Sequence, residues 1–101
     1  MMLLTKEIRS KLPPLYANEE KKPEEVPVIV KFFTPDSNWT WYATEFDGID
    51  RFFGFVRGHD AELGYFSLSE LEKATGPLGL HIERDRHFGP HTLAEVMKES
   101  L

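Results

Sequence analysis

The middle of the chain reads Trp39-Thr40-Trp41-Tyr42-Ala43-Thr44-Glu45-Phe46-Asp47-Gly48-Ile49-Asp50-Arg51-Phe52-Phe53-Gly54-Phe55-Val56-Arg57. Aromatic and β-branched residues dominate both ends of this stretch, which favours strands over 39–46 and 51–57. The Asp-Gly pair between them favours a tight turn, so the two strands should pair as an antiparallel hairpin. Gly54, inside the second strand, indicates a β-bulge or the close approach of another backbone.

Further strands are expected on both sides of this hairpin. Residues 26–34 are rich in Val, Ile and Phe and are apolar on both faces apart from Lys31, which predicts an interior strand. The turn sequence 35–38 joins it to the hairpin, so the three strands form an antiparallel meander. Residues 64–66 favour a short strand, and residues 78–83 favour a last one.

Three short helices are expected beside the sheet. Thr5 can cap a helix over 5–11, and two prolines follow it. Ser67 and Thr92 are each followed three residues later by Glu, the capping-box pattern that begins a helix. The apolar residues expected to face the sheet are Leu4, Ile8, Leu12, Leu68, Leu71, Leu93, Val96 and Met97. The sequence therefore predicts an α+β fold: a single small domain over residues 1–101, an antiparallel β-meander of three to five strands with short helices at the N-terminus, middle and C-terminus.

Composition narrows the class of protein. The 101 residues include 12 Lys plus Arg and 17 Asp plus Glu, a net charge of -5, which disfavours a basic nucleic-acid surface. Without Cys there is no disulfide framework and no Cys zinc site. Neither a membrane span nor a signal sequence is recognisable, so the expected location is the cytoplasm and no membrane partner is expected. The acidity is local, because residues 36–70 carry seven acids and two bases, and also nine of the 13 aromatic residues.

Recognised catalytic motifs are missing, which favours a non-enzymatic protein without a cofactor. The alternative is a small hydrolase that uses the carboxylates of Glu45 or Asp47 with Tyr65 or Arg84. His81, Glu83, Asp85 and His87 are an alternative metal site, because they would share one face if the last strand ran through residue 87. The apolar pattern stops at Ile82, however, so we expect a strand ending near Glu83, a polar loop and no metal.

The aromatic and acidic segment is the main candidate for a binding site. Strict alternation places Trp39, Trp41, Ala43, Glu45 and Asp47 on one face and Thr40, Tyr42, Thr44 and Phe46 on the other. The aromatic residues are either core residues or the lining of a groove with carboxylates at its rim, suited to a cationic or amphipathic partner or to a sugar ring. Arg84 and Asp85 are either a recognition pair or an ion pair at the end of the sheet. The candidate binding residues are Trp39, Trp41, Tyr42, Glu45, Asp47, Tyr65, Arg84 and Asp85.

A further alternative is single-stranded nucleic-acid binding on an aromatic sheet face. Such a surface needs basic residues beside the aromatic ones. Only Lys31, Arg51 and Arg57, on flanking strands, could supply that charge. The charge pattern therefore disfavours this alternative.

Most of the chain resembles one bacterial family. The resemblance is carried by Lys31-Phe32-Phe33-Thr34-Pro35, Ser37-Asn38-Trp39-Thr40-Trp41-Tyr42-Ala43-Thr44-Glu45-Phe46-Asp47-Gly48, Phe52-Phe53-Gly54, Glu62-Leu63-Gly64-Tyr65-Phe66-Ser67-Leu68-Ser69-Glu70-Leu71, Gly79-Leu80 and Ile82-Glu83-Arg84-Asp85. Over roughly residues 3–97 the sequence resembles the family known as domain of unknown function 2958. The resemblance implies a small single-domain protein, often carried on plasmids and other mobile elements, and implies no catalytic residue.

The chain departs from the family pattern at Asp36, His81 and His87. His81 and His87 belong to the alternative metal site, so the departure argues against that site. Together with the missing catalytic motifs, the resemblance predicts a binding or regulatory module that acts on a protein partner. The oligomeric state is not predicted.

Overall fold

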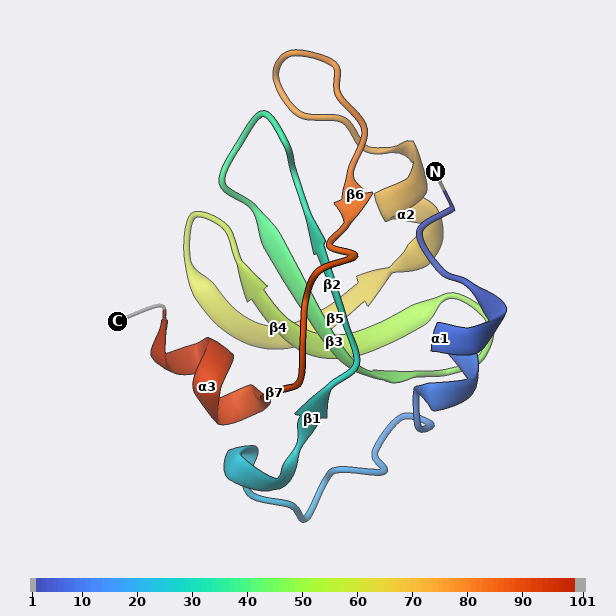
Figure 1. Cartoon of the computed structure of the whole chain (residues 1–101), viewed down its shortest axis with the longest axis vertical. Helices are drawn as coiled ribbons and strands as arrows, with labels where there is room; N and C mark the ends of the chain where they lie inside the picture. Colours follow the sequence, from blue (N-terminus) through green and yellow to red (C-terminus); the bar gives the residue numbers. More distant parts are fainter. Residues whose placement is uncertain (1, 100–101) are drawn as a thin grey trace.

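The main sheet contains five antiparallel strands in the order β5-β4-β3-β2-β6, in a computed structural model that describes residues 2–99 (Figure 1). Its strands are β2 (Val30–Phe33), β3 (Thr40–Phe46), β4 (Arg51–Arg57), β5 (Ala61–Ser67) and β6 (Glu83–Arg84). β2 to β5 follow one another in space as in sequence, which confirms the meander. The α+β class is confirmed as well.

The strand predicted over 26–34 is divided. Its second half is β2, whereas β1 (Pro27–Val28) leaves the main sheet and pairs with β7 (His91–Thr92). The division lies at Ile29, whose N–H still reaches the carbonyl oxygen of Ala43 at 2.9 Å. The prediction of a single strand was therefore wrong, because the two halves pair with different strands: the first half with β7, and the second with β3 and β6.

The last predicted strand, 78–83, was also wrong. Only Glu83–Arg84 pairs with β2, and the chain before it forms a turn around Gly79, whose φ is 82°. The Asp36 carboxylate holds this turn, since it accepts hydrogen bonds from the N–H groups of Leu78 (2.8 Å) and Leu80 (3.4 Å). β5, in contrast, is longer than the predicted 64–66.

All three predicted helices are present. They are α1 (Lys6–Lys11), α2 (Leu68–Lys73) and α3 (Leu93–Lys98), together with a 3₁₀ turn, η1 (Pro23–Glu25). Thr5 and Thr92 cap α1 and α3, and Thr92 forms the full capping box with Glu95. Ser67 caps α2 by accepting the N–H of Glu70, without the reciprocal bond from the Glu70 carboxylate. All three local capping signals therefore place a helix start correctly.

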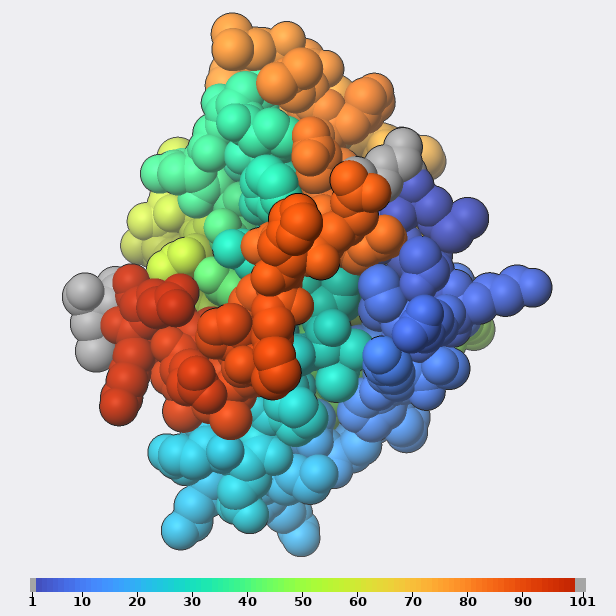
Figure 2. Space-filling view, in the orientation of Figure 1, coloured from blue at the N-terminus to red at the C-terminus, as the bar shows by residue number. Residues whose placement is uncertain are grey.

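The sheet is covered on both faces. One core cluster joins Phe32, Phe46 and Phe52 to the apolar residues of α1 and α2. The other joins Tyr42 and Phe55 to α3 and to Phe88. Figure 2 shows residues 85–92, in orange to red, lying across the face that carries this second cluster. Since both faces are packed, neither shows the clean polar alternation of a half-exposed sheet.

A β-bulge in β3 changes the face assignment predicted by alternation. The pairing with β4 shifts between Ala43 and Glu45, and the extra residue, Thr44, donates its hydroxyl to the Phe53 carbonyl oxygen at 3.1 Å. Glu45 consequently lies on the same face as Tyr42, while Phe46 joins the core on the Trp41 face. Strict alternation was wrong beyond Ala43, because one inserted residue reverses the side on which each later residue lies.

The Asp50 carboxylate ties the β3–β4 turn to the start of α2. It accepts hydrogen bonds from the hydroxyl of Ser67 (2.6 Å) and from the N–H of Ser69 (2.8 Å). These bonds, led by the one from Ser67, hold the pKa of Asp50 below its ordinary value. A lowered folded-state pKa stabilises the fold above the unfolded-state pKa, and this contribution is lost as the pH falls through the folded-state pKa.

We therefore expect the free energy of unfolding to fall as the pH is lowered below about 4, the ordinary pKa of an aspartate. In Asp50→Asn this decrease should be shallower, because the titrating group is gone. Urea unfolding between pH 5 and pH 2 measures it. Asp60→Asn is the control, because the Asp60 side chain accepts no hydrogen bond within residues 2–99. Equal slopes for wild type and Asp50→Asn would contradict the assignment.

Candidate binding site

A cavity of about 300 Å³ lies between the segment that follows α1 and one face of β3 to β5. Its apolar walls are formed by Tyr16, Val26, Phe53, Leu63, Tyr65 and Leu93, and we call it the Tyr16–Tyr65 pocket. Its volume is at the lower end of the range for small-molecule sites, and its surface is mainly apolar and aromatic, as in most such sites. The polar residues that line it are Asn18, Glu19, Lys21, Thr44 and Glu45.

Glu45 is the buried carboxylate in the wall of this pocket, which Glu19 also lines. Its side chain is 4% exposed, and its two oxygens accept the N–H groups of Tyr16 (2.8 Å) and Asn18 (2.9 Å). These bonds join β3 to a loop almost thirty residues earlier in the chain. Glu45 therefore anchors the segment that closes the pocket, and it reaches this position because of the bulge.

Two tyrosines stand at the pocket mouth. Tyr65 donates its hydroxyl to that of Tyr16 at 3.4 Å, and this bond raises the pKa of Tyr65. The Tyr65 ring also packs edge-on against Phe53 and lies beneath the guanidinium of Arg51. Tyr16 has a φ of 72°, which is uncommon for a residue with a side chain. Both rings are exposed large aromatic groups, available to a partner.

Asn18 contributes an unused hydrogen-bond donor to the pocket. Its amide nitrogen Nδ2 is buried and has no hydrogen-bond partner among residues 2–99. A buried donor without an acceptor is unfavourable, so a bound group with an oxygen acceptor would gain from meeting it.

Trp39 and Trp41 lie on the other face. Their rings stack with centroids 5.9 Å apart, both are half-buried, and they line a second groove of about 320 Å³ with Pro77. Trp39 also covers Gly58, where an added Cβ would meet its ring. The predicted grouping of these rings with Glu45 and Asp47 is not formed, because Glu45 is on the opposite face and Asp47 is in the turn.

Asp47 acts locally. Its Oδ1 accepts the N–H groups of Ile49 (2.8 Å), Asp50 (2.8 Å) and Arg51 (3.0 Å). These hydrogen bonds, led by the one from Ile49, lower the pKa of Asp47. Of the residues predicted for a hydrolase, only Glu45 and Tyr65 share the pocket, whereas Asp47 and Arg84 do not line it.

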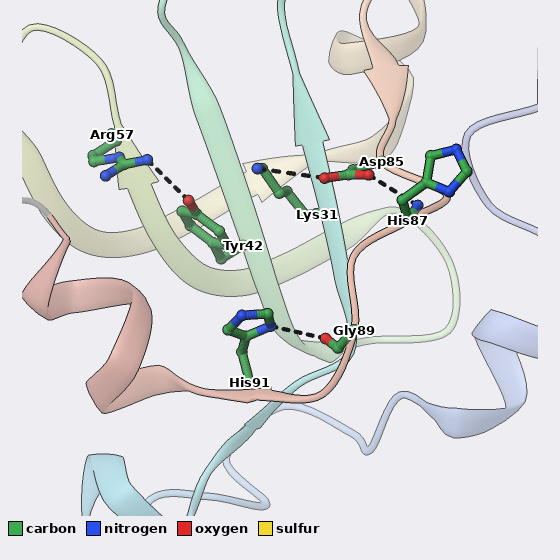
Figure 3. Close-up of polar contacts among 7 residues, drawn as sticks. All are labelled: Lys31, Tyr42, Arg57, Asp85, His87, Gly89 and His91. Carbon is green, nitrogen blue, oxygen red and sulfur yellow. Dashed lines mark hydrogen bonds and ion pairs between the residues drawn. The ribbon is translucent and has the colours of Figure 1, made fainter.

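Tyr42 is 1% exposed, which leaves it no surface for a partner. It packs on Phe55 and Phe88. Its hydroxyl accepts a hydrogen bond from Arg57 at 3.0 Å, and Figure 3 shows this contact. Burial, opposed by the nearby Arg57 charge, raises the pKa of Tyr42.

The basic residues that could serve nucleic-acid binding do not lie beside the Trp pair. They share the sheet face of Tyr42, opposite the face of Trp39 and Trp41, and are Lys31, Arg51 and Arg57.

Arg84 and Asp85 do not pair with each other. Arg84 holds the N-terminal segment by donating to the carbonyl oxygens of Met2 (2.6 Å) and Leu3 (3.0 Å). Asp85 forms an ion pair with Lys31 at 3.4 Å and accepts the backbone N–H of His87 (Figure 3). Within the part of the chain that the structure describes, no group of three or more His, Asp or Glu side chains is placed to hold a metal ion.

The pocket contains residues that the sequence did not single out. Tyr16, Phe53 and Leu63 were missed, as was the part that residues 18–23 play in lining the pocket. The one local signal was the pair Leu15-Tyr16 directly after the two prolines 13 and 14. Of the predicted site residues, only Glu45 and Tyr65 meet in this pocket.

Comparison with known proteins identifies a family and no function. A family model described as "Protein of unknown function (DUF2958)" matches residues 3–99. No curated protein and no solved structure matches the chain. None of the helices within residues 2–99 is long and apolar enough to cross a membrane.

Proposed function

The chain belongs to the DUF2958 family, whose description assigns no function, and we propose that it is a protein-binding module whose site is the Tyr16–Tyr65 pocket. The partner inserts one large apolar side chain into this pocket. The proposal includes the link to plasmids and mobile elements that the resemblance implies, with a partner encoded by the host or by the element.

The observation that carries the proposal is the combination of an apolar cavity with exposed apolar side chains at its mouth. Leu63 and Tyr65 are 45% and 50% exposed on neighbouring positions of one sheet face. Protein interfaces concentrate binding energy where an aromatic or aliphatic anchor fills such a pocket. Both oxygens of Glu45 already accept backbone N–H groups, which favours a structural role over hydrolysis.

The test is selection of linear peptides from a random library on the immobilised protein, followed by calorimetric titration of the selected peptides. Leu63→Ala should weaken their binding about tenfold or more, because it removes a wall of the pocket. Leu80→Ala is the matched control: its side chain is 48% exposed and lies outside the pocket. Failure to select any peptide, or equal effects of the two substitutions, would contradict the proposal.

A further inference from the structure

β5 is one of the two edge strands of the main sheet, and the edge of β5 that faces away from β4 is unpaired within residues 2–99. The two ends of the β4–β5 ladder show which groups face outward. The N–H of Leu68 bonds to the Asp50 carbonyl oxygen, and that of Gly58 bonds to the Asp60 carbonyl oxygen. In an antiparallel ladder such bonded pairs recur at every second residue. The N–H and C=O groups of Ala61, Leu63 and Tyr65 therefore point away from β4.

This edge has little of the protection that natural edge strands carry. Strands of this kind are usually short, or contain proline or charged residues (lysine above all), or are covered by another segment. The one charged residue of β5 is Glu62. β5 has seven residues and contains neither proline nor lysine. No hydrogen bond from elsewhere in residues 2–99 reaches the outward backbone groups of Leu63 or Tyr65.

Side chains around the edge define the chemistry of an added strand. Leu63 and Tyr65 lie on the pocket face, whereas Glu62 lies on the opposite face and has no ion-pair partner among the described residues. The segments 17–25 and 58–67, which border the pocket and the edge, carry six acids and two lysines. An added strand that alternates apolar and basic residues would place its apolar side chains beside the pocket and its basic ones beside Glu62.

We infer that the partner binds as an extra strand on the outer edge of β5, through an extended segment that alternates apolar and basic residues. This inference rests on the proposed function, since the same segment fills the Tyr16–Tyr65 pocket. Backbone hydrogen bonds to β5 supply affinity, and the pocket and Glu62 select the side chains. A second copy of the chain fits less well, because two molecules with a net charge of -5 repel each other.

The probe is the synthetic peptide Lys-Val-Lys-Trp-Lys-Val-Lys-Val, titrated calorimetrically against the wild-type protein. N-methylation of alternate residues removes the N–H groups on one edge of the bound peptide. Methylation of one alternating set should weaken binding about tenfold or more, because several hydrogen bonds are lost, and the other set should leave binding nearly unchanged. The peptide with Glu in place of every Lys should bind at least about tenfold more weakly. Equal binding of the Lys and Glu peptides would overturn the partner chemistry.

Ala61→Pro tests the same edge from the protein side. Proline removes an outward N–H without breaking the ladder to β4, and it is tolerated at the first residue of a strand. We expect Ala61→Pro to weaken peptide binding severalfold and Ala61→Val, which keeps the N–H, to retain it. If neither Ala61→Pro nor N-methylation matters while Leu63→Ala still weakens binding, strand addition is overturned and the pocket proposal stands. If wild type sediments as a dimer without peptide and Ala61→Pro as a monomer, the occupant is a second copy and the inferred partner is wrong.

Discussion

Gly54→Ala should lower the free energy of unfolding by about 3 kcal/mol or more, or prevent folding altogether. A Cβ at this position would lie 1.8 Å from the carbonyl oxygen of Tyr42 and 3.1 Å from the Cα of Ala43. These are backbone atoms of β3 beside the bulge, so they cannot move aside by changing a rotamer. Relief would require β3 and β4 to separate. Urea unfolding monitored by circular dichroism measures the loss.

Gly64→Ala provides the matched control for Gly54. Gly64 pairs directly with Gly54 in the register, so both residues lie on the same face of the sheet. An added Cβ at Gly64 would meet nothing within 4 Å. We expect Gly64→Ala to be within about 0.5 kcal/mol of wild type or slightly more stable, because alanine has less conformational entropy to lose. Similar losses for both variants would contradict the close approach of β3 to β4.

Glu45→Ala is the second substitution with a large expected effect. It removes the acceptor of two hydrogen bonds, leaving the N–H groups of Tyr16 and Asn18 without their partner. Each buried polar group left unsatisfied costs roughly 1–3 kcal/mol, so a total of about 3 kcal/mol is expected. Urea unfolding measures the total. Hydrogen exchange at the amides of Tyr16 and Asn18 should accelerate strongly, since both depend on this carboxylate.

Glu62→Ala is the control for Glu45→Ala, because Glu62 is exposed and forms no side-chain hydrogen bond or ion pair within residues 2–99. It should change the free energy of unfolding by no more than about 0.5 kcal/mol. The anchoring role would be contradicted if Glu45→Ala were equally mild and the amides of residues 16 and 18 kept their protection.

Peptide binding should also decrease in Glu45→Ala, because the loop that closes the pocket would lose its anchor.

Both substitutions bear on the acidic segment that the sequence identified. Four of its seven acids, Asp36, Glu45, Asp47 and Asp50, accept hydrogen bonds from backbone N–H groups. These four carboxylates thus satisfy backbone N–H groups in turns and loops, where no strand or helix provides an acceptor. The carboxylates of Asp60, Glu62 and Glu70 accept no such bonds within the described residues and are free to contact the proposed partner.

Local signals account for the parts of the fold that the sequence predicted. Thr5, Ser67 and Thr92 each accept an N–H three residues later, so each helix start depends on a few adjacent residues. The meander follows from short turns between β-rich runs. Gly54 correctly marked a close backbone approach, whereas the bulge lies in the neighbouring strand β3, between Ala43 and Glu45. These features could be predicted because the interacting groups are neighbours in sequence or on adjoining strands.

The sequence by itself therefore determined the α+β class, the order of the meander and the helix starts. Only the tertiary structure decided that strand 26–34 divides between two partners, that the bulge moves Glu45 to the other face, and that Tyr16 and Tyr65 meet across a pocket. Each of these depends on contacts between distant residues, such as the bond from Tyr16 to Glu45. Their formation depends on how the whole chain packs. In addition, an alternating pattern of apolar and polar residues does not reveal where one extra residue is inserted in a strand.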